Sequence, residues 1–280
     1  MADKFNWVQQ NTNSGTRNVV QNILTSEDYL KWIGVGVSVV LTLVVGYFLF
    51  RVTLFVNAEL LISIIPLFVR AWALVLFIVV VTSVFSLIGG FLLALGRHSD
   101  TTITYAFSTA YSEFFRGVPL LFLLFVIFVG IPSFWDAGQF PISNWAIPTA
   151  IIASTLLVSA YMGEAIKGGI DAVPDGQLEA ARTLGLSRPQ AMIHIVLPQA
   201  GRNALAAIVN EEIHLIKSTS VMTVIAVPEI IQTFREVNSA HFDPWTPLVL
   251  VAVSYLALTL PLGVIYRQLQ TRYDWGETNV

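Results

Sequence analysis

Apolar runs of about 20 residues recur along this chain, and they restrict its fold more than any other feature. Because lipid offers no hydrogen-bond partner to a free backbone group, each run that crosses a bilayer must be helical. The chain is therefore expected to be an all-α, polytopic membrane protein with about six transmembrane helices. The runs cover residues 32–50, 68–95, 118–131 with an earlier start within 105–117, 146–166, 205–227 and 247–266.

The composition agrees with a lipid-facing surface. Only 12% of the 280 residues are charged, whereas a soluble domain carries roughly 25%. The formal net charge of −3 gives no indication of a nucleic-acid partner. The chain has no cysteine, which excludes disulfides and thiolate metal sites.

The ends of the chain are both predicted to lie in the cytoplasm. Residues 1–30 form a polar tail without apolar periodicity or signal-peptide features, so the helix over 31–51 is expected to remain as a span. The segment 132–145 lacks Lys and Arg and is expected to be an outer loop with Trp135 and Trp145 as anchors. With the tail inside, basic residues gather at inner helix ends, namely Lys4, Arg17, Lys31, Arg97, Lys167, Arg182, Arg188, Arg202, Arg267 and Arg272, while Arg51, Arg70 and Arg235 fall outside or at the outer boundary.

The longest polar stretch between two spans, residues 168–203, contains signals for two short helices. Asp175 is a candidate N-cap, and Gly185 is placed to end the first helix. Ser187 and Gln190 have the spacing of a capping box at the start of the second. The pattern predicts a stiff cytoplasmic elbow, which a flexible loop would not need.

This elbow carries a family motif. The pattern resembles the EAA loop of ATP-binding-cassette (ABC) importer permeases, and it consists of Glu179-Ala180-Ala181, Gly185 after three residues, and Ile195-Val196-Leu197-Pro198 after nine more. The resemblance implies that the elbow docks in a groove of a cytoplasmic ATPase. Glu179 would offer a charge to that partner, and Pro198 is expected to limit the second helix. The alternative is a solvated amphipathic loop.

Further segments are similar to those of polar amino acid permeases of the histidine, glutamine, glutamate and arginine type. Lys167 stands where that family has Arg, and Ser218 where it has Asp. The resemblance covers about residues 68–272, so the helix over 31–51 is expected to be an addition to the five-helix core of an ABC type-1 permease. The segments are Glu113-Phe114-Phe115-Arg116-Gly117-Val118-Pro119-Leu120-Leu121, Ala160-Tyr161-Met162-Gly163-Glu164-Ala165-Ile166-Lys167-Gly168-Gly169-Ile170, Leu197-Pro198-Gln199-Ala200, Lys217-Ser218-Thr219-Ser220-Val221 and Val227-Pro228-Glu229.

Two pairs of opposite charge have helical i,i+3 spacing near span ends. Glu164 and Lys167 are expected to form an ion pair that orients their helix, with direct substrate contact as the alternative. Glu113 and Arg116 are expected to form a structural or gating pair.

One apolar span carries several polar groups. Glu211, His214, Lys217 and Ser218 fall on one helical face and are candidates for lining a translocation pathway. Glu212 lies on the opposite face, where the family has an apolar residue, and could meet a second permease subunit. The alternative is an internal charge network that fixes packing.

The expected function is the permease subunit of an ABC importer for polar amino acids, in the cell membrane of a bacterium or archaeon. The resemblance implies two cytoplasmic ATPase subunits, a second permease subunit that is the same or paralogous, and an extracytoplasmic amino-acid-binding protein. The partner ATPase would bind ATP and Mg, so no cofactor is expected on this chain, which lacks a G-x-x-x-x-G-K-[ST] loop. An opine or a sulfur-containing amino acid is the closest alternative substrate.

Two other classes of membrane protein fit the sequence less well. An ion-gradient-driven secondary transporter would use the charged span as a proton relay, but no inverted repeat is evident and the elbow would have no role. A membrane-bound enzyme would need a catalytic cluster, which the sequence lacks. The histidines are scattered and are not expected to bind metal, at His98, His194, His214 and His241.

Overall fold

The computed structural model describes residues 27–136 and 138–273, and it is almost entirely helical over them. Of the predicted tail over residues 1–30, residues 1–26 lie outside the described residues. The chain divides into two compact units, Met1–Val56 and Asn57–Val280. Each is described by itself.

The first unit contains one long helix, α2, over Glu27–Thr53. It contains the predicted span over residues 31–51. Its apolar side chains point to all sides, and Lys31–Thr53 is long and apolar enough to cross a membrane. A helix of this kind is typical of a lipid-facing span.

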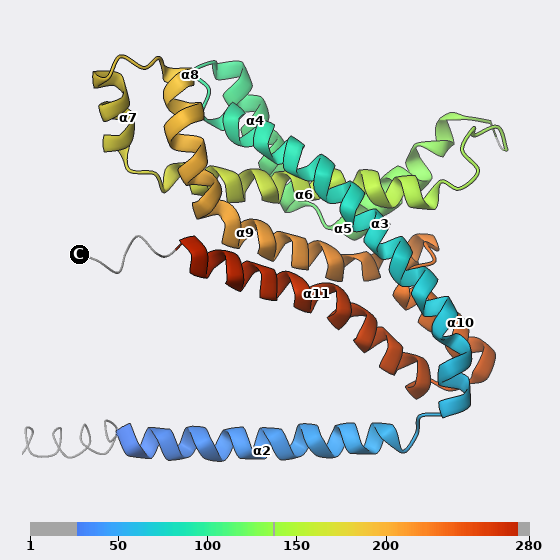
Figure 1. Cartoon of the computed structure of the whole chain (residues 1–280). Coiled ribbons are helices and arrows are strands. Elements are labelled where there is room, and N and C mark those ends of the chain that lie inside the picture. Colours follow the sequence, from blue (N-terminus) through green and yellow to red (C-terminus); the bar gives the residue numbers. More distant parts are fainter. Residues whose placement is uncertain (1–26, 137, 274–280) are drawn as a thin grey trace, which may run out of the picture. The chain divides into compact units, whose positions relative to one another are not determined.

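The second unit is a bundle of helices (Figure 1). Four of its helices are long and apolar enough to span a membrane, so the described residues hold five such helices with α2, or six if the bent α4–α5 pair counts as one span. The expected number of spans is thereby confirmed. The elements are α3 (Ala58–Arg97), α4 (Thr102–Gly117), α5 (Leu120–Phe125), η1 (Val126–Gly130), η2 (Pro132–Phe134), α6 (Ala146–Asp171), α7 (Asp175–Thr183), α8 (Arg188–Ala191), η3 (Met192–Val196), α9 (Leu197–Ser218), η4 (Thr219–Ile225), α10 (Ile230–His241) and α11 (Trp245–Tyr273).

Helix α3 begins ten residues before the predicted start at residue 68 and runs through Pro66. Asn57 caps it, because the Asn57 side chain accepts a hydrogen bond from the Leu60 amide at 3.1 Å. At 1.5 Å per residue the 40-residue helix is about 60 Å long, twice the hydrocarbon thickness of a bilayer. One end of α3 must therefore project beyond the hydrocarbon core or the helix must tilt.

The third predicted span is broken. Helices α4 and α5 meet at an angle of 99°, so the expected helix over 118–131 does not continue straight back into 105–117. Val118 is extended, with φ −101° and ψ 131°, since the ring of Pro119 excludes the helical region for the residue before it. Pro119 then precedes the first residue of α5.

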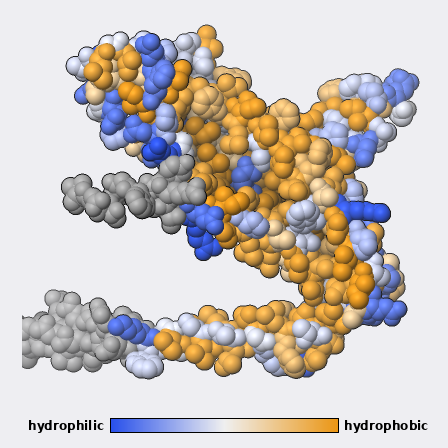
Figure 2. Space-filling view, viewed as in Figure 1, coloured by the Kyte–Doolittle hydropathy of each residue, from blue (hydrophilic) through white to orange (hydrophobic). Residues whose placement is uncertain are grey.

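Helix α6 lies at the centre of the unit, packed against α3 and α9. Glycines permit the close approach: a Cβ on Gly90 would lie 2.6 Å from Cβ of Met162, and one on Gly169 would lie 2.5 Å from the Ala200 carbonyl oxygen. Apolar side chains cover the middle of the bundle, and hydrophilic ones gather at the α7–α8 end (Figure 2).

The predicted span over 205–227 is the C-terminal part of a longer rod that starts at Arg188. Helix α9 passes into the 3-10 turn η4, and the chain reverses at Ala226, whose φ is 58°. The amphipathic helix α10 follows, which the hydropathy of the sequence does not predict. Glu229 starts it, since its carboxylate accepts hydrogen bonds from the amides of Ile231 and Gln232 at 2.8 Å each.

Candidate functional site

The predicted elbow consists of α7, α8 and the turn between them. Gly185 ends α7 as predicted, with φ at +80°, a conformation that favours glycine. The Gly185 amide donates to the Arg182 carbonyl at 2.9 Å and the Leu186 amide to the Ala181 carbonyl at 3.1 Å, which is the Schellman pattern. Asp175 is not the N-cap: Pro174 holds that position and Asp175 begins the helix.

The second half of the elbow runs directly into the membrane helix. Gln190 accepts hydrogen bonds from the Ser187 amide and hydroxyl at 2.9 Å each, in agreement with the predicted start. Pro198 does not end the helix, contrary to the prediction. The π-helical turn η3 just before α9 absorbs the missing amide of Pro198, so one rod extends from Arg188 through α9.

The two faces of α7 differ. Glu179 and Ala180 are exposed, whereas Ala181 is fully buried. Leu184 at the tip of the turn is 80% exposed. On the returning arm Leu197 is half-buried and packs against a core formed by α3, α6 and α9, while Pro198 is exposed. The elbow therefore presents a small-residue surface with an apolar tip.

The base of the elbow is tied to the end of α3. Arg188 forms an ion pair with Asp100, and its guanidinium also donates to the His98 carbonyl at 3.5 Å. The hydrogen bond from Arg188 lowers the pKa of Asp100. Both groups are solvent-exposed, so the pair orients the elbow more than it stabilises the fold.

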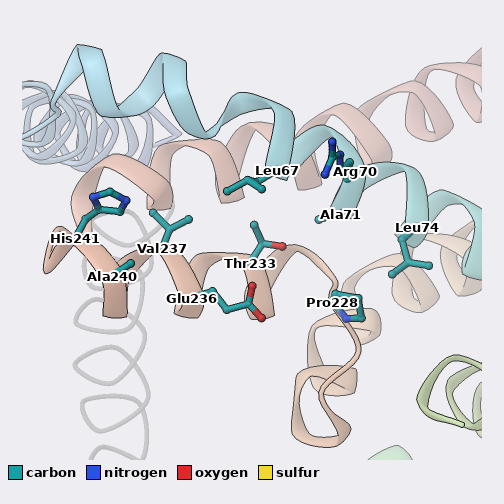
Figure 3. A pocket seen from close by; sticks show the side chains of 10 residues that line it. All are labelled: Leu67, Arg70, Ala71, Leu74, Pro228, Thr233, Glu236, Val237, Ala240 and His241. Atoms are coloured by element: carbon teal, nitrogen blue, oxygen red, sulfur yellow. The ribbon is translucent and has the colours of Figure 1, made fainter. Parts of the chain in front are cut away.

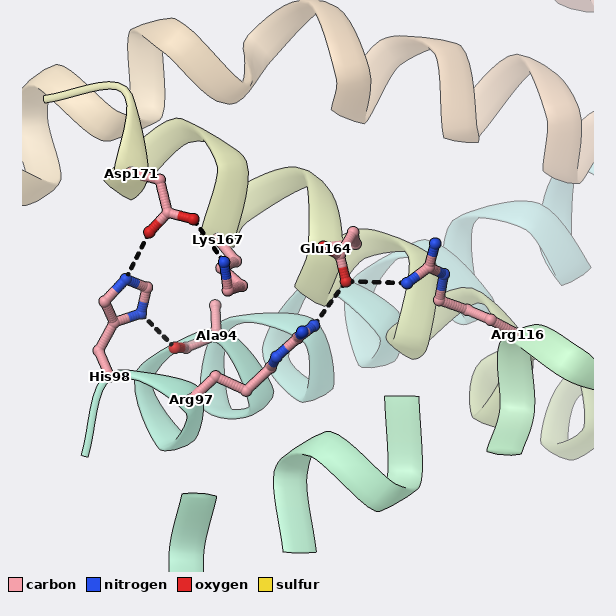
Figure 4. Close-up of polar contacts among 7 residues, drawn as sticks. All are labelled: Ala94, Arg97, His98, Arg116, Glu164, Lys167 and Asp171. Atoms are coloured by element: carbon pink, nitrogen blue, oxygen red, sulfur yellow. Dashed lines mark hydrogen bonds and ion pairs between the residues drawn. The ribbon is translucent and has the colours of Figure 1, made fainter. Parts of the chain in front are cut away.

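A network of ion pairs joins α3, α4 and α6 (Figure 4). The predicted Glu164–Lys167 pair is not among the ion pairs of the described residues. Glu164 instead accepts from Arg97 at 2.5 Å and from Arg116 at 3.0 Å. Lys167 pairs with Asp171, one turn along α6.

Two further contacts complete this network. The predicted Glu113–Arg116 pair is present at 4.0 Å, so Arg116 lies between two carboxylates. Asp171 also contacts His98 Nε2 at 3.0 Å, and His98 Nδ1 lies 2.8 Å from the Ala94 carbonyl oxygen. The elbow end of the bundle is thus held by charges from three helices.

A cavity of about 290 Å³ adjoins this network, between α4–α5, α6 and α9. Glu211, His214 and Ser218 line it together with Arg116 and Tyr161. Three of the four predicted pathway residues are therefore brought together, while Lys217 is exposed and does not line the cavity. Arg116 faces both this cavity and Glu164, a double position that the i,i+3 spacing alone did not reveal.

Glu212 lies away from this cavity. Its carboxylate accepts a hydrogen bond from the Ser83 hydroxyl at 2.5 Å, so this side of α9 packs on α3 of the same chain. That contact gives one Glu212 oxygen an intramolecular partner, and a contact of this face with a second subunit stays a prediction. Among the described residues, no three His, Asp or Glu side chains gather as a metal site would require.

Comparisons with known proteins assign this architecture to a family. Residues 86–275 match the family model of the binding-protein-dependent transport system inner membrane component. The chain belongs to this family. This membership favours a binding-protein-dependent importer over the ion-gradient-driven transporter.

Individual relatives of this permease agree with the family assignment. It is 34% identical to the probable amino-acid permease protein YxeN of Bacillus subtilis (strain 168), over 78% of this chain and 95% of YxeN. It is 33% identical to the arginine transport system permease protein ArtQ of the same organism, over 74% of this chain and 93% of ArtQ. The crystal structure of an amino acid ABC transporter with histidines superposes with a TM-score of 0.70 and 28% identity, over 78% of this chain and 99% of the other.

Proposed function

We propose that this permease is the membrane subunit of an ABC importer for polar amino acids, in the cell membrane of a bacterium or archaeon. The named relatives supply the substrate class, since one carries arginine in its name and another carries amino acids. The zwitterionic substrate would pass through the cavity beside Arg116, in which Glu211 can attract an ammonium group. A separate binding protein would deliver it from outside.

The continuity of the elbow with the cavity wall carries this proposal. The same rod that starts at Arg188 presents Glu211, His214 and Ser218 to the cavity. From Arg188 to Glu211 it extends about 35 Å. A push on the elbow can therefore move the cavity wall without a flexible joint, as coupling to a distant ATPase requires.

The exposed surface of α7 supports an ATPase dock. Glu179 and Ala180 are open to a partner, and Leu184 offers an apolar tip. Two ATPase subunits would bind ATP and Mg and close on the elbows of two permease subunits. This chain would supply the pathway and the lever, and would not itself hydrolyse ATP.

The test compares two adjacent alanines. Ala180→Glu places a charge on the exposed side of α7, and we expect it to abolish co-purification of the ATPase while the permease keeps its thermal stability. Ala181→Glu is the matched control, since Ala181 is fully buried and the charge should unfold the elbow itself. If Ala180→Glu retains the ATPase and amino-acid-stimulated ATP hydrolysis, the elbow is not the dock.

A further inference from the structure

A second cavity lies between α3 and α10, and it shares no lining residue with the cavity beside Arg116. Its volume is about 530 Å³. Pockets for small ligands start at roughly 300 Å³. Figure 3 shows Arg70 on the α3 wall and Thr233 and Glu236 on the α10 wall.

This cavity lies at the end of α3 remote from the elbow. Arg70 precedes Arg97, which lies in the ion-pair network, by about 40 Å of helix. Even at the largest usual tilt of about 40°, that length spans roughly 30 Å, the thickness of the hydrocarbon core. The cavity therefore lies near the opposite membrane boundary from the elbow, where water and solutes reach it.

The charges on its walls are not satisfied by one another. Arg70 has no ion pair or hydrogen bond to any described residue, so its guanidinium can still bind a carboxylate in two-point fashion. One Glu236 oxygen accepts from Gln232 at 3.0 Å, and the other has no partner among the described residues. The Thr233 side chain is buried beside them.

Apart from His241, the remaining lining is apolar. Leu67, Leu74 and Val237 contribute to a wall beside the charged groups. A cation and an anion on two different helices, with an apolar wall beside them, match the carboxylate, ammonium and side-chain stem of an amino acid.

We propose that this outer cavity is an amino-acid-binding site, in which Arg70 binds the α-carboxylate and Glu236 the α-ammonium group. The inference rests on the proposed function. It adds a binding site on the outer side that the amino acid would occupy before the cavity beside Arg116. Because the contacts are to the groups that all amino acids share, the site accepts different polar side chains. Analogues that lack the carboxylate or the ammonium group do not bind.

The absence of cysteine from the sequence permits a local test. A single cysteine at Ala240, which lines the cavity, is labelled with a methanethiosulfonate reagent in the permease complex in lipid nanodiscs. L-glutamine and L-arginine are the probes, and both should slow the labelling. The matched control is Ser239→Cys, exposed and adjacent but outside the lining, whose labelling rate should not change.

Charge variants identify the binding groups. Arg70→Gln or Glu236→Gln in the Ala240→Cys background should raise the half-protecting concentration by about tenfold or more. Arg235→Gln, next to Glu236 but not in the lining, should leave it unchanged. Labelling that neither probe slows, or protection that survives Arg70→Gln, would overturn the proposal. ATP-driven uptake of the same amino acids distinguishes failure of the outer-site proposal from failure of the proposed function. Uptake without protection from labelling would contradict only the outer site. Absence of uptake would contradict the proposed function as well.

Discussion

Glu164 is a carboxylate shared by two arginines from different helices. Arg97 and Arg116 both donate to one of its oxygens, and the Arg97 side chain is only 12% exposed. Removal of the carboxylate charge would leave a mostly buried guanidinium without its anion, which costs more than the loss of a surface pair.

Glu164→Gln is therefore expected to lower the free energy of unfolding by about 1–3 kcal/mol. Thermal unfolding of the purified complex in detergent measures the change. Lys167→Gln is the matched control, because the Lys167–Asp171 pair is an i,i+4 contact on one helix and contributes only about 0.5 kcal/mol. Equal effects of the two substitutions would contradict a special role for Glu164.

Asp243, between α10 and α11, makes a pH-dependent contribution to the free energy of unfolding. The hydrogen bond from the Thr246 hydroxyl at 2.6 Å lowers the pKa of Asp243 from 3.8, and the amides of Thr246 and Trp245 act in the same direction. A lowered pKa in the folded state contributes stability above pH 3.8 that is lost as the pH falls through the lowered value. Asp243→Asn should flatten the acid limb of a stability-against-pH profile, and an unchanged limb would show that Asp243 does not contribute.

At the scale of elements, glycines set how closely α6 approaches its neighbours. A Cβ on Gly90 would lie 2.8 Å from the backbone nitrogen of Gly163, which cannot move away alone. The glycines at these positions thus let two helix backbones touch, as small residues do between membrane helices.

Gly90→Ala should accordingly separate α3 from α6 and lower the melting temperature, at a cost of about 1–3 kcal/mol. Gly201→Ala is the control within α9, because no atom lies within 4 Å of its added methyl group. There the better helix propensity of alanine should stabilise by up to about 1 kcal/mol. A Gly90→Ala protein as stable as the parent would show that α3 can shift without loss.

The elements that the sequence predicted well are those with local signals. The α7 turn follows from Gly185, and the polar face of α9 follows from helical spacing, because three of its residues do line one cavity. The bend at Pro119 and the amphipathic α10 were missed, since the hydropathy of a run reports burial in lipid and not a change of direction. The partner of Glu164 was also missed, because contacts between helices far apart in sequence leave no local pattern.

At the scale of the whole molecule, residues 57 onward form a compact unit with its own cores, and its first residue takes part in it. The Asn57 amide donates to the Thr246 hydroxyl oxygen at 2.9 Å, which joins the start of α3 to the start of α11. The Asn57 side chain also caps α3. The boundary between the units therefore falls immediately before a structural residue.

Two truncations test that boundary. A chain that begins at Asn57 behind a start methionine should insert, bind the ATPase and melt within a degree or two of the full chain, because every contact of the second unit described above is retained. A chain that begins at Leu61 loses the cap and the link to Thr246, and should be less stable by about 1–2 kcal/mol. Thermal unfolding and co-purification of the ATPase measure both. If the chain that begins at Asn57 fails to fold or to bind the ATPase, the permease requires the first unit with α2. If the chains that begin at Asn57 and Leu61 are equally stable, the Asn57 contacts do not hold α3 against α11.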